Sequence, residues 1–173
     1  EVVLGPKDPL TAESLGNLGY VLKTMDNLAG AKSYFERALA IREEVQGPKH
    51  PDTSIALNSM GYLLQSMGDL AAAKQYLERA LAIREEVLGP KHPNTATSLS
   101  NLALLLRLMG DLAGAKSYYE RTLAVDMEVL GPKHPYTAVS NNSLGALLVS
   151  MGDLATAKRY FEQALAIQEE VLG

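Results

Sequence analysis

Three histidines and several paired glutamates are the residues of this sequence whose types could support acid–base chemistry or metal binding. The histidines are His50, His92 and His134, and each stands in a copy of the stretch GPKHP. Histidine is the usual acid, base or metal ligand near neutral pH. A fourth copy of the stretch reads GPKDP and carries Asp8 at the histidine position. The repetition leaves two interpretations, a chemical site or a joint between identical building units.

The spacing of these loops favours the second interpretation, a joint between identical building units. Their glycines stand at positions 5, 47, 89 and 131, which is a step of 42 residues each time. Metal ligands must converge to about 2–2.3 Å from one ion, whereas equivalent residues of stacked helix pairs lie on the order of 8–10 Å apart. We therefore expect a row of histidines that pin the turn, with the Asp or Thr that follows capping the next helix. No metal site and no cofactor is predicted.

The glutamate pairs indicate a solvated helix face. The pairs Glu43-Glu44, Glu85-Glu86 and Glu169-Glu170 recur at one helical position, beside Arg42, Arg84 and Gln168 respectively. Paired carboxylates can support general acid–base catalysis, but a recurring position is more typical of a surface. No catalytic Ser, His and Asp context, glycine-rich phosphate loop or zinc spacing is present in the sequence. We therefore predict that the protein is not an enzyme.

Composition narrows the classes of protein and partner. Of the 173 residues, 47% are hydrophobic and 21% are charged, which is ordinary for a soluble folded chain. A net charge of −4 provides no basic field for nucleic acid or an anionic membrane. The longest apolar candidate, Leu102 to Met109, is interrupted by Arg107, and there is no cysteine. We expect no nucleic-acid or membrane partner and a cytoplasmic location.

The elements that position these residues are helices. One apolar stripe precedes Gly68 and a second follows it, and both have helical spacing. Gly68 is predicted to end the first helix and Asp69 to cap the second, whereas in the first repeat Asp26 or Asn27 must do both tasks less well. The stripes are formed by Leu57, Met60, Gly61, Leu64 and Met67, and by Leu70, Ala73, Leu77, Ala80 and Leu81.

The repeat length predicts an all-α array of helix pairs, because periods of 20–50 residues are typical of solenoids and related arrays. The leading EVVLG matches EEVLG at the end of later repeats, so we expect the chain to be part of a longer array. The predicted segments are the tail of a preceding repeat at 1–4 and four repeats at 5–46, 47–88, 89–130 and 131–173.

The stretch ALNSMGYLLQSMGDLAAAKQYLERALAI resembles the tetratricopeptide repeat (TPR). The repeat is longer than the common ~34 residues, and its GPKHP joint is similar to the long type found in kinesin light chains. Two positions depart from the signature, Thr122 and Asn141; we interpret Asn141 as a loosened or exposed end of the array, with a polar contact as the alternative. The signature positions of the second repeat are Leu57, Met60, Gly61, Leu64, Ala73, Leu77 and Ala80.

The resemblance implies a right-handed α-solenoid of four antiparallel helix pairs, a TPR-like superhelix whose first helices line a concave groove. In that groove Tyr20 and Tyr62 would form an aromatic platform that gives way to Leu104. The asparagines would contact a peptide backbone, and Lys23 and Arg107 would stand as isolated cations. The implied peptide-binding residues are Asn17, Tyr20, Lys23, Asn58, Tyr62, Gln65, Asn101, Leu104, Arg107 and Asn142.

These implications lead to a protein–protein interaction module that binds an extended peptide segment in the groove. The alternative is a structural scaffold whose uncapped ends associate head to tail, since solenoid ends that lack polar caps leave complementary faces exposed. The expected partner is a protein or peptide in the first case and another copy of the chain in the second.

Overall fold

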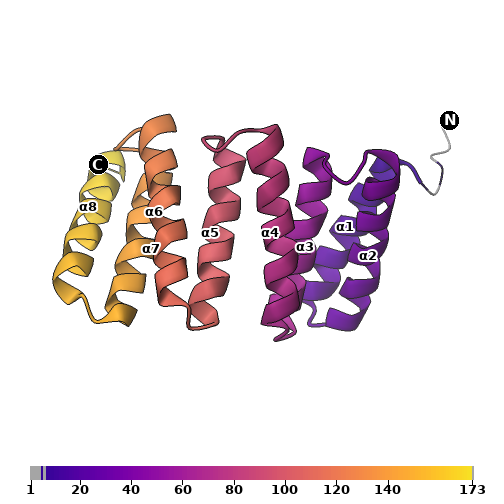
Figure 1. Ribbon diagram of the computed structural model, residues 1–173, viewed down its shortest axis with the longest axis horizontal. Helices are drawn as coiled ribbons and strands as arrows, with labels where there is room; N and C mark the ends of the chain where they lie inside the picture. The colour runs from indigo at the N-terminus through magenta and orange to yellow at the C-terminus, as the bar shows by residue number, and fades with distance from the viewer. Residues whose placement is uncertain (1–4, 6, 173) are drawn as a thin grey trace. The chain divides into compact units, whose positions relative to one another are not determined.

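The computed structural model describes residue 5 and residues 7–172, which form eight α-helices arranged as four pairs (Figure 1). No strand occurs in that part of the chain, so the predicted all-α fold of helix pairs is confirmed. The predicted tail of a preceding repeat, residues 1–4, lies outside the described residues. The helices are α1 (Pro9–Thr24), α2 (Leu28–Val45), α3 (Pro51–Ser66), α4 (Leu70–Val87), α5 (Pro93–Leu108), α6 (Leu112–Val129), α7 (Pro135–Met151) and α8 (Leu154–Leu172).

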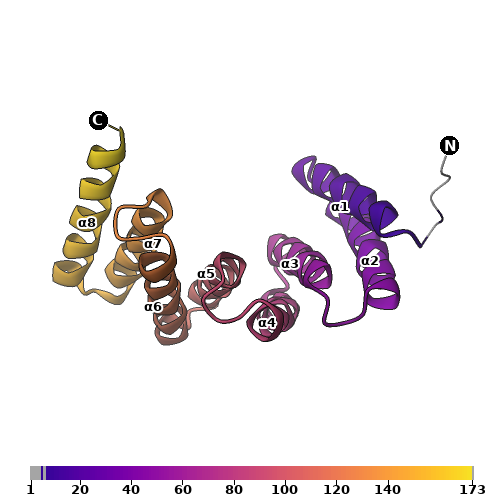
Figure 2. The same ribbon diagram turned by 90° about the horizontal axis from the view of Figure 1, so that it is seen from above.

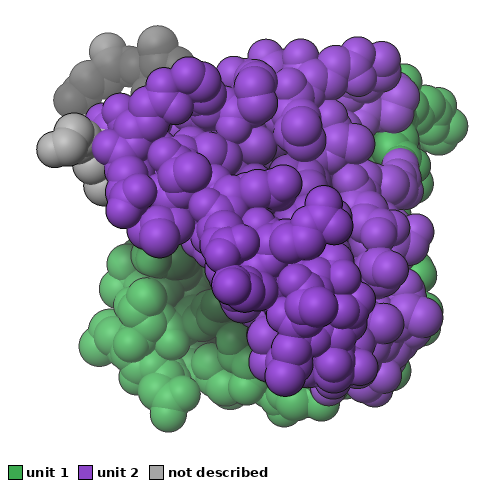
Figure 3. Space-filling model, turned by 90° about the vertical axis from the view of Figure 1, so that its left-hand side faces the viewer, with its two compact units in different colours: residues 1–88 green, residues 89–173 purple. Residues whose placement is uncertain are grey.

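The helices belong to two compact units, which Figure 3 distinguishes by colour. Unit 1 comprises residues 1–88 and contains α1 to α4; unit 2 comprises residues 89–173 and contains α5 to α8. Within each unit the helices of a pair pack closely, and the second helix of the first pair also contacts the next pair, α2 against α3 and α6 against α7 (Figure 2). None of the helices described has both the length and the apolar character needed to cross a membrane.

The turn inside each pair follows the predicted chemistry. Gly68 adopts φ +82°, a left-handed conformation that glycine enters at little cost, and the Asp69 carboxylate accepts a hydrogen bond from the Ala72 N–H at 3.0 Å. In the first repeat Asp26 takes the left-handed position with φ 61°, and Asn27 provides the cap. The two tasks that were expected to fall to Asp26 or Asn27 are thus divided between these two residues.

The loop between pairs uses its histidine as the helix cap. Nδ1 of His92 accepts a hydrogen bond from the Asn94 N–H at 3.1 Å, and His50 and His134 make the equivalent bond. Asp8 does the same with a carboxylate oxygen at 2.8 Å. The joint interpretation is thus supported, but the prediction that the following Asp or Thr caps the helix is wrong. A proline occupies the first helical position, which leaves the residue before it as the cap.

Close packing inside the pairs depends on glycine. A Cβ atom placed on Gly61 would lie 2.6 Å from Cδ2 of Leu77, and one placed on Gly19 would lie 2.8 Å from the Phe35 ring. Real Cβ atoms do not approach other heavy atoms so closely, so the small residue of the signature lets the two helices of a pair meet.

Asn141 is buried, which overturns its interpretation as a loosened or exposed end. It occupies the position that Leu57 and Leu99 fill in earlier repeats, on the inner face of a first helix. In unit 2 it lines a cavity of about 450 Å³ together with Leu123 and Ile167. The signature position therefore keeps its place in the core even when its residue is polar.

Candidate functional site

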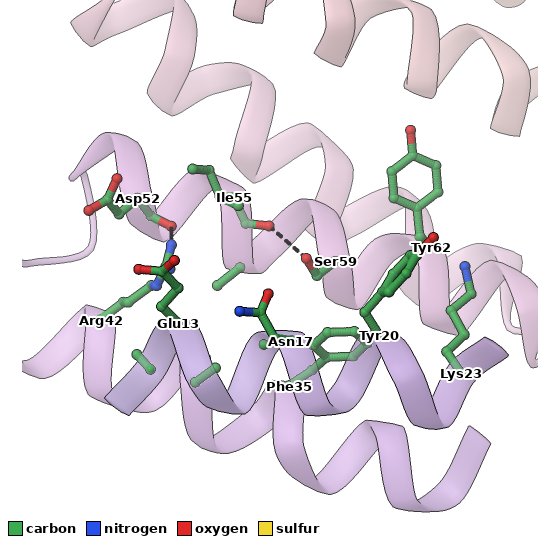
Figure 4. A pocket seen from close by; sticks show the side chains of 14 residues that line it. Glu13, Asn17, Tyr20, Lys23, Phe35, Arg42, Asp52, Ile55, Ser59 and Tyr62 are labelled. Carbon is green, nitrogen blue, oxygen red and sulfur yellow. Dashed lines mark hydrogen bonds between the residues drawn. The ribbon is translucent and has the colours of Figure 1, made fainter. Parts of the chain in front are cut away.

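Unit 1 contains a cavity of about 530 Å³, bounded by α1, α2 and α3, which we call the first cavity (Figure 4). The first helices of two successive repeats provide most of its wall, and α2 provides its floor. Its lining residues are Ala12, Glu13, Gly16, Asn17, Tyr20, Lys23, Phe35, Ala38, Arg42, Asp52, Ile55, Ala56, Ser59 and Tyr62.

One end of the first cavity is aromatic. Tyr20 and Tyr62 lie there beside Lys23, whose Nζ stands 5.6 Å from the centre of the Tyr62 ring, within cation–π range (Figure 4). The Tyr20 side chain is 64% exposed and is available to a ligand. Burial raises the pKa of Tyr62, although the nearby Arg84 guanidinium lowers it, so the hydroxyl is neutral near pH 7. This end offers two ring faces, a neutral hydroxyl donor and one cation.

The other end of the first cavity is polar and charged. Arg42 Nη1 donates a hydrogen bond to the Asp52 backbone carbonyl at 2.5 Å (Figure 4). Gln46 Nε2 donates to the Asp52 carboxylate at 2.9 Å. Arg42 was considered only as a neighbour of the glutamate pairs on a solvated face; it is half-buried and lines the cavity. Arg42 follows Phe35 and Ala38 at helical spacing, so it continues the inward stripe of α2.

Arg84 occupies the same position in the second repeat and, unlike the half-buried Arg42, is buried. Its Nε donates a hydrogen bond to the Ser54 hydroxyl at 2.9 Å, and burial lowers the pKa of its guanidinium. At the fourth repeat the equivalent Gln168 is exposed.

Unit 2 contains an equivalent cavity of about 400 Å³, which we call the second cavity. Nine of its lining positions match positions of the first cavity two repeats earlier, for example Asn101 with Asn17 and Asp126 with Arg42. The two cavities therefore arise from one repeated geometry with different side chains. The lining residues are Pro93, Asn94, Ala96, Thr97, Ser100, Asn101, Thr122, Asp126, Leu130, Tyr136, Val139 and Ser140.

Five of the ten predicted groove residues line these cavities. Asn17, Tyr20, Lys23 and Tyr62 come together at the first cavity, and Asn101 lies at the second. Asn58 does not serve as an exposed amide, because it is buried and its Nδ2 donates to the Ser54 carbonyl at 3.1 Å. As a ligand contact Asn58 therefore stays a prediction, and its amide lies in the buried part of unit 1.

The remaining predicted residues lie outside the two linings. Arg107 is not an isolated cation, because its guanidinium hydrogen-bonds the buried Tyr119 hydroxyl, whose pKa burial raises. Gln65, Leu104 and Asn142 are half-buried on their helices. The role of these four residues as ligand contacts stays a prediction. Arg107 also has a structural role, because it hydrogen-bonds Tyr119.

The sequence-based prediction missed the wall that the second helices contribute. Arg42 and Asp126 come from α2 and α6, whereas only first-helix positions were considered. The signal was present in the helical spacing that joins Arg42 to Phe35 and Ala38. Within the described part of the chain, no three His, Asp or Glu side chains converge as metal ligands would.

The fold and the cavities define a protein built of helix–turn–helix repeats that expose cavities between the first helices of successive repeats. The sequence profile of the tetratricopeptide repeat matches residues 1–44, 10–86, 52–128 and 100–170, so the chain belongs to the tetratricopeptide repeat family. The family prediction is confirmed. Repeats of this family generally mediate protein–protein interaction or scaffolding, and no catalytic family is indicated.

Solved structures with the same fold include BtubC (BKLC) from P. vanneervenii, with a TM-score of 0.87 and 21% identity over 96% of this chain. This chain covers 66% of BtubC, slightly less than two thirds of its length. A putative kinesin light chain with nearly identical TPR-like repeats from Podosopora anserina has a TM-score of 0.83 and 23% sequence identity. The match covers 98% of this chain and 80% of that one. MamA has a TM-score of 0.68 and 21% sequence identity, over 95% of this chain and 82% of MamA. At these identities the likeness shows the fold alone. No curated protein sequence matches the chain.

Proposed function

We propose that the protein binds an extended peptide segment along the first helices of its repeats, with the first cavity as the anchoring site. The observation that carries this proposal is the convergence of an amide, two aromatic rings and a cation from two successive repeats on one space of about 530 Å³. Tyrosine is an effective anchor because it brings a large rigid ring and a polar tip at low entropic cost.

The groups at the first cavity match an extended peptide. Asn17 carries both a donor and an acceptor, so its amide can pair with a peptide backbone that has no internal hydrogen bonds. Tyr20 and Tyr62 can hold one apolar or aromatic side chain between them, and Lys23 favours an acceptor or a carboxylate nearby. The exposed Ile55 and the buried Ala56 add apolar surface to the cavity lining.

The test is a displayed random-peptide selection on the whole chain, followed by affinity measurements of the enriched peptides. Replacing both rings, Tyr20→Ala with Tyr62→Ala, is expected to weaken binding at least tenfold, since anchor residues are each worth 1–2 kcal/mol or more, in order of magnitude. Tyr76→Ala is the matched control, because Tyr76 lies on α4 of the same unit and outside the cavity lining. Equal losses in both variants would contradict the proposal.

We also propose self-association as a second candidate function, which two exposed faces favour. Leu18 on α1 is 49% exposed, whereas the equivalent Met60 is 1% exposed. Leu165 on α8 is 53% exposed, whereas the equivalent Leu39 is 7% exposed. In the repeat, α8 is equivalent to α2 and α1 is equivalent to α3, and α2 packs against α3 inside unit 1. The exposed faces of α8 and α1 therefore correspond to the two sides of that contact. A second copy can therefore supply the missing half.

An ion pair between repeats adds charge complementarity. Arg79 Nη2 lies 2.8 Å from Glu43 Oε1 inside unit 1. The equivalent residues at a head-to-tail junction are Arg37 of one copy and Glu169 of the other, so the same pair can form there. The pair itself is exposed and contributes mainly to register and orientation.

Light scattering over a range of concentrations tests this second candidate. The wild-type mass is expected to rise above 18.6 kDa with concentration, and Arg37→Glu or Glu169→Arg alone should suppress the rise. In a mixture, each variant presents the charge that the other lacks at both kinds of junction, so the mass should again rise with concentration. A wild-type mass that stays at the monomer value would reject self-association and leave the peptide-binding proposal intact.

A further inference from the structure

The second cavity carries a buried acid where the first cavity carries a base. Asp126 occupies the position of Arg42, and its side chain is 7% exposed. Within the described part of the chain, its hydrogen-bond partner is the Ser140 hydroxyl at 2.5 Å, and no lysine or arginine pairs with it. Buried aspartates are rarely found without a cationic partner, because the loss of hydration penalises the charged form.

The position of Asp126 on its helix adds to this cost. It stands in the last turn of α6, where the carbonyl ends of the helix dipole disfavour negative charge. The equivalent last turns of α2 and α4 carry Arg42 and Arg84, as the dipole favours. Burial raises the pKa of Asp126, while the Ser140 hydrogen bond and the His134 imidazole lower it. The site is therefore built around an acid that its own surroundings compensate poorly.

The hydroxyls around Asp126 present acceptors to the cavity. The Ser140 hydroxyl donates its proton to Asp126. The Thr122 hydroxyl donates to the Tyr118 carbonyl at 3.0 Å, and the Thr97 hydroxyl donates to the Pro93 carbonyl at 3.1 Å. Each of these oxygens keeps lone pairs that can accept a further hydrogen bond. A carboxylate with several acceptors and a free volume of about 400 Å³ matches a group that has several N–H donors and a positive charge.

We infer that the second cavity is a subsite for a cationic side chain, a lysine ammonium or an arginine guanidinium, of the bound peptide. This assignment rests on the proposed peptide-binding function and names the chemistry of one ligand position. The two cavities then select different side chains with one geometry, since the first presents aromatic rings with Arg42 and the second presents Asp126 among acceptor oxygens.

Small cations test the subsite independently of any peptide. The uniformly labelled whole chain is titrated with butylammonium chloride and with ethylguanidinium chloride at constant ionic strength, and the NMR signals are followed. Saturable shifts are expected at the backbone of residues 97–101, 122–126 and 136–140. Asp126→Asn, which keeps the shape of the side chain, should weaken both probes at least tenfold. Glu120→Gln on the same helix is the control, because Glu120 is exposed and pairs with Lys116.

A second readout concerns the carboxyl group itself. A cation bound beside Asp126 stabilises its charged form, so the ¹³C carboxyl titration of Asp126 should move to lower pH when either probe is present. Shifts that do not saturate, that persist in Asp126→Asn, or that leave this titration unmoved would overturn the subsite. Because the probes contain no peptide, that result would not affect the peptide selection at the first cavity, and failure of the selection would not affect the probes.

Discussion

At the scale of single residues, the histidines of the GPKHP loops act through one ring nitrogen. Nδ1 accepts the N–H two residues on, in the manner of the aspartate and asparagine caps at the other turns. The N–H groups of a helix start have no partner within the helix, so an acceptor at this point stabilises both the helix and the direction of the loop.

His92→Ala is expected to lower the free energy of unfolding by roughly 0.5–2 kcal/mol, because the Asn94 N–H loses its acceptor. His92→Asp should restore most of the loss, since Asp8 caps α1 in the same loop sequence. Urea unfolding of the two variants beside wild type provides the measurement. A loss of the same size in both variants would show that the ring contributes by packing and not by capping.

Asp126 makes stability depend on pH. Burial raises the pKa of Asp126 in the folded state, so the folded protein holds this proton to a higher pH than the unfolded chain does. The free energy of unfolding of wild type relative to Asp126→Asn should therefore fall as the pH rises from the ordinary aspartate pKa of about 3.9 through the raised value. Urea unfolding of both proteins across this range checks the sign, and a difference that grows with pH would contradict it.

At the scale of helices, close approach within a pair depends on where a glycine lies. A Cβ atom on Gly19 would meet the buried Phe35 ring, whereas one on Gly16 would meet nothing within 4 Å. Gly19→Ala is expected to destabilise by about 1–3 kcal/mol through overpacking. Gly16→Ala should stabilise by roughly 0.5–1 kcal/mol, because alanine is the better helix former. Thermal or urea unfolding of the two variants, which differ by one helical turn of α1, should give opposite signs.

The turn between α1 and α2 contains a strained backbone conformation at Asp26, which a glycine would relieve. Asp26 adopts φ 61°, where later repeats place Gly68, Gly110 and Gly152. A residue with a Cβ atom pays about 1–2 kcal/mol for this conformation, so Asp26→Gly is expected to raise the free energy of unfolding by about 1 kcal/mol. Gly110→Asp is the reverse exchange and should lower it. A fall in stability for Asp26→Gly would mean that the aspartate side chain makes a compensating contact.

The helices, their turns and the small residues of the signature could be predicted because each depends on a local period or a single backbone conformation. Three assignments could not. His92 was not expected as a cap because histidine is not among the favoured capping residues. Arg42 was considered only as a neighbour of the glutamates on a solvated face, whereas the stripe of α2 places it in the cavity wall. Asn141 was placed outside because of its polarity, although its position lies in the core.

At the scale of the whole molecule, the repeat produces the same cavity once in each unit and then varies its lining. The sequence located Asn17, Tyr20, Lys23 and Tyr62 at the first cavity because these residues follow the family motif on α1 and α3. It could not locate the contribution of α2 and α6, since the motif does not include the end of the second helix. The chemical difference between the cavities therefore depends on residues such as Asp126 that only the packed structure brings to the site.

The most direct test of the central claim is to map an enriched peptide onto the ¹⁵N-labelled chain by amide chemical-shift changes. We expect the largest changes on α1 and α3 at the residues that line the first cavity, among them Asn17, Tyr20 and Tyr62. That result would place peptide recognition on the first helices of successive repeats. Changes confined to the exposed face of α4 and α6 around Glu78 and Glu120, with α1 and α3 unmoved, would contradict it.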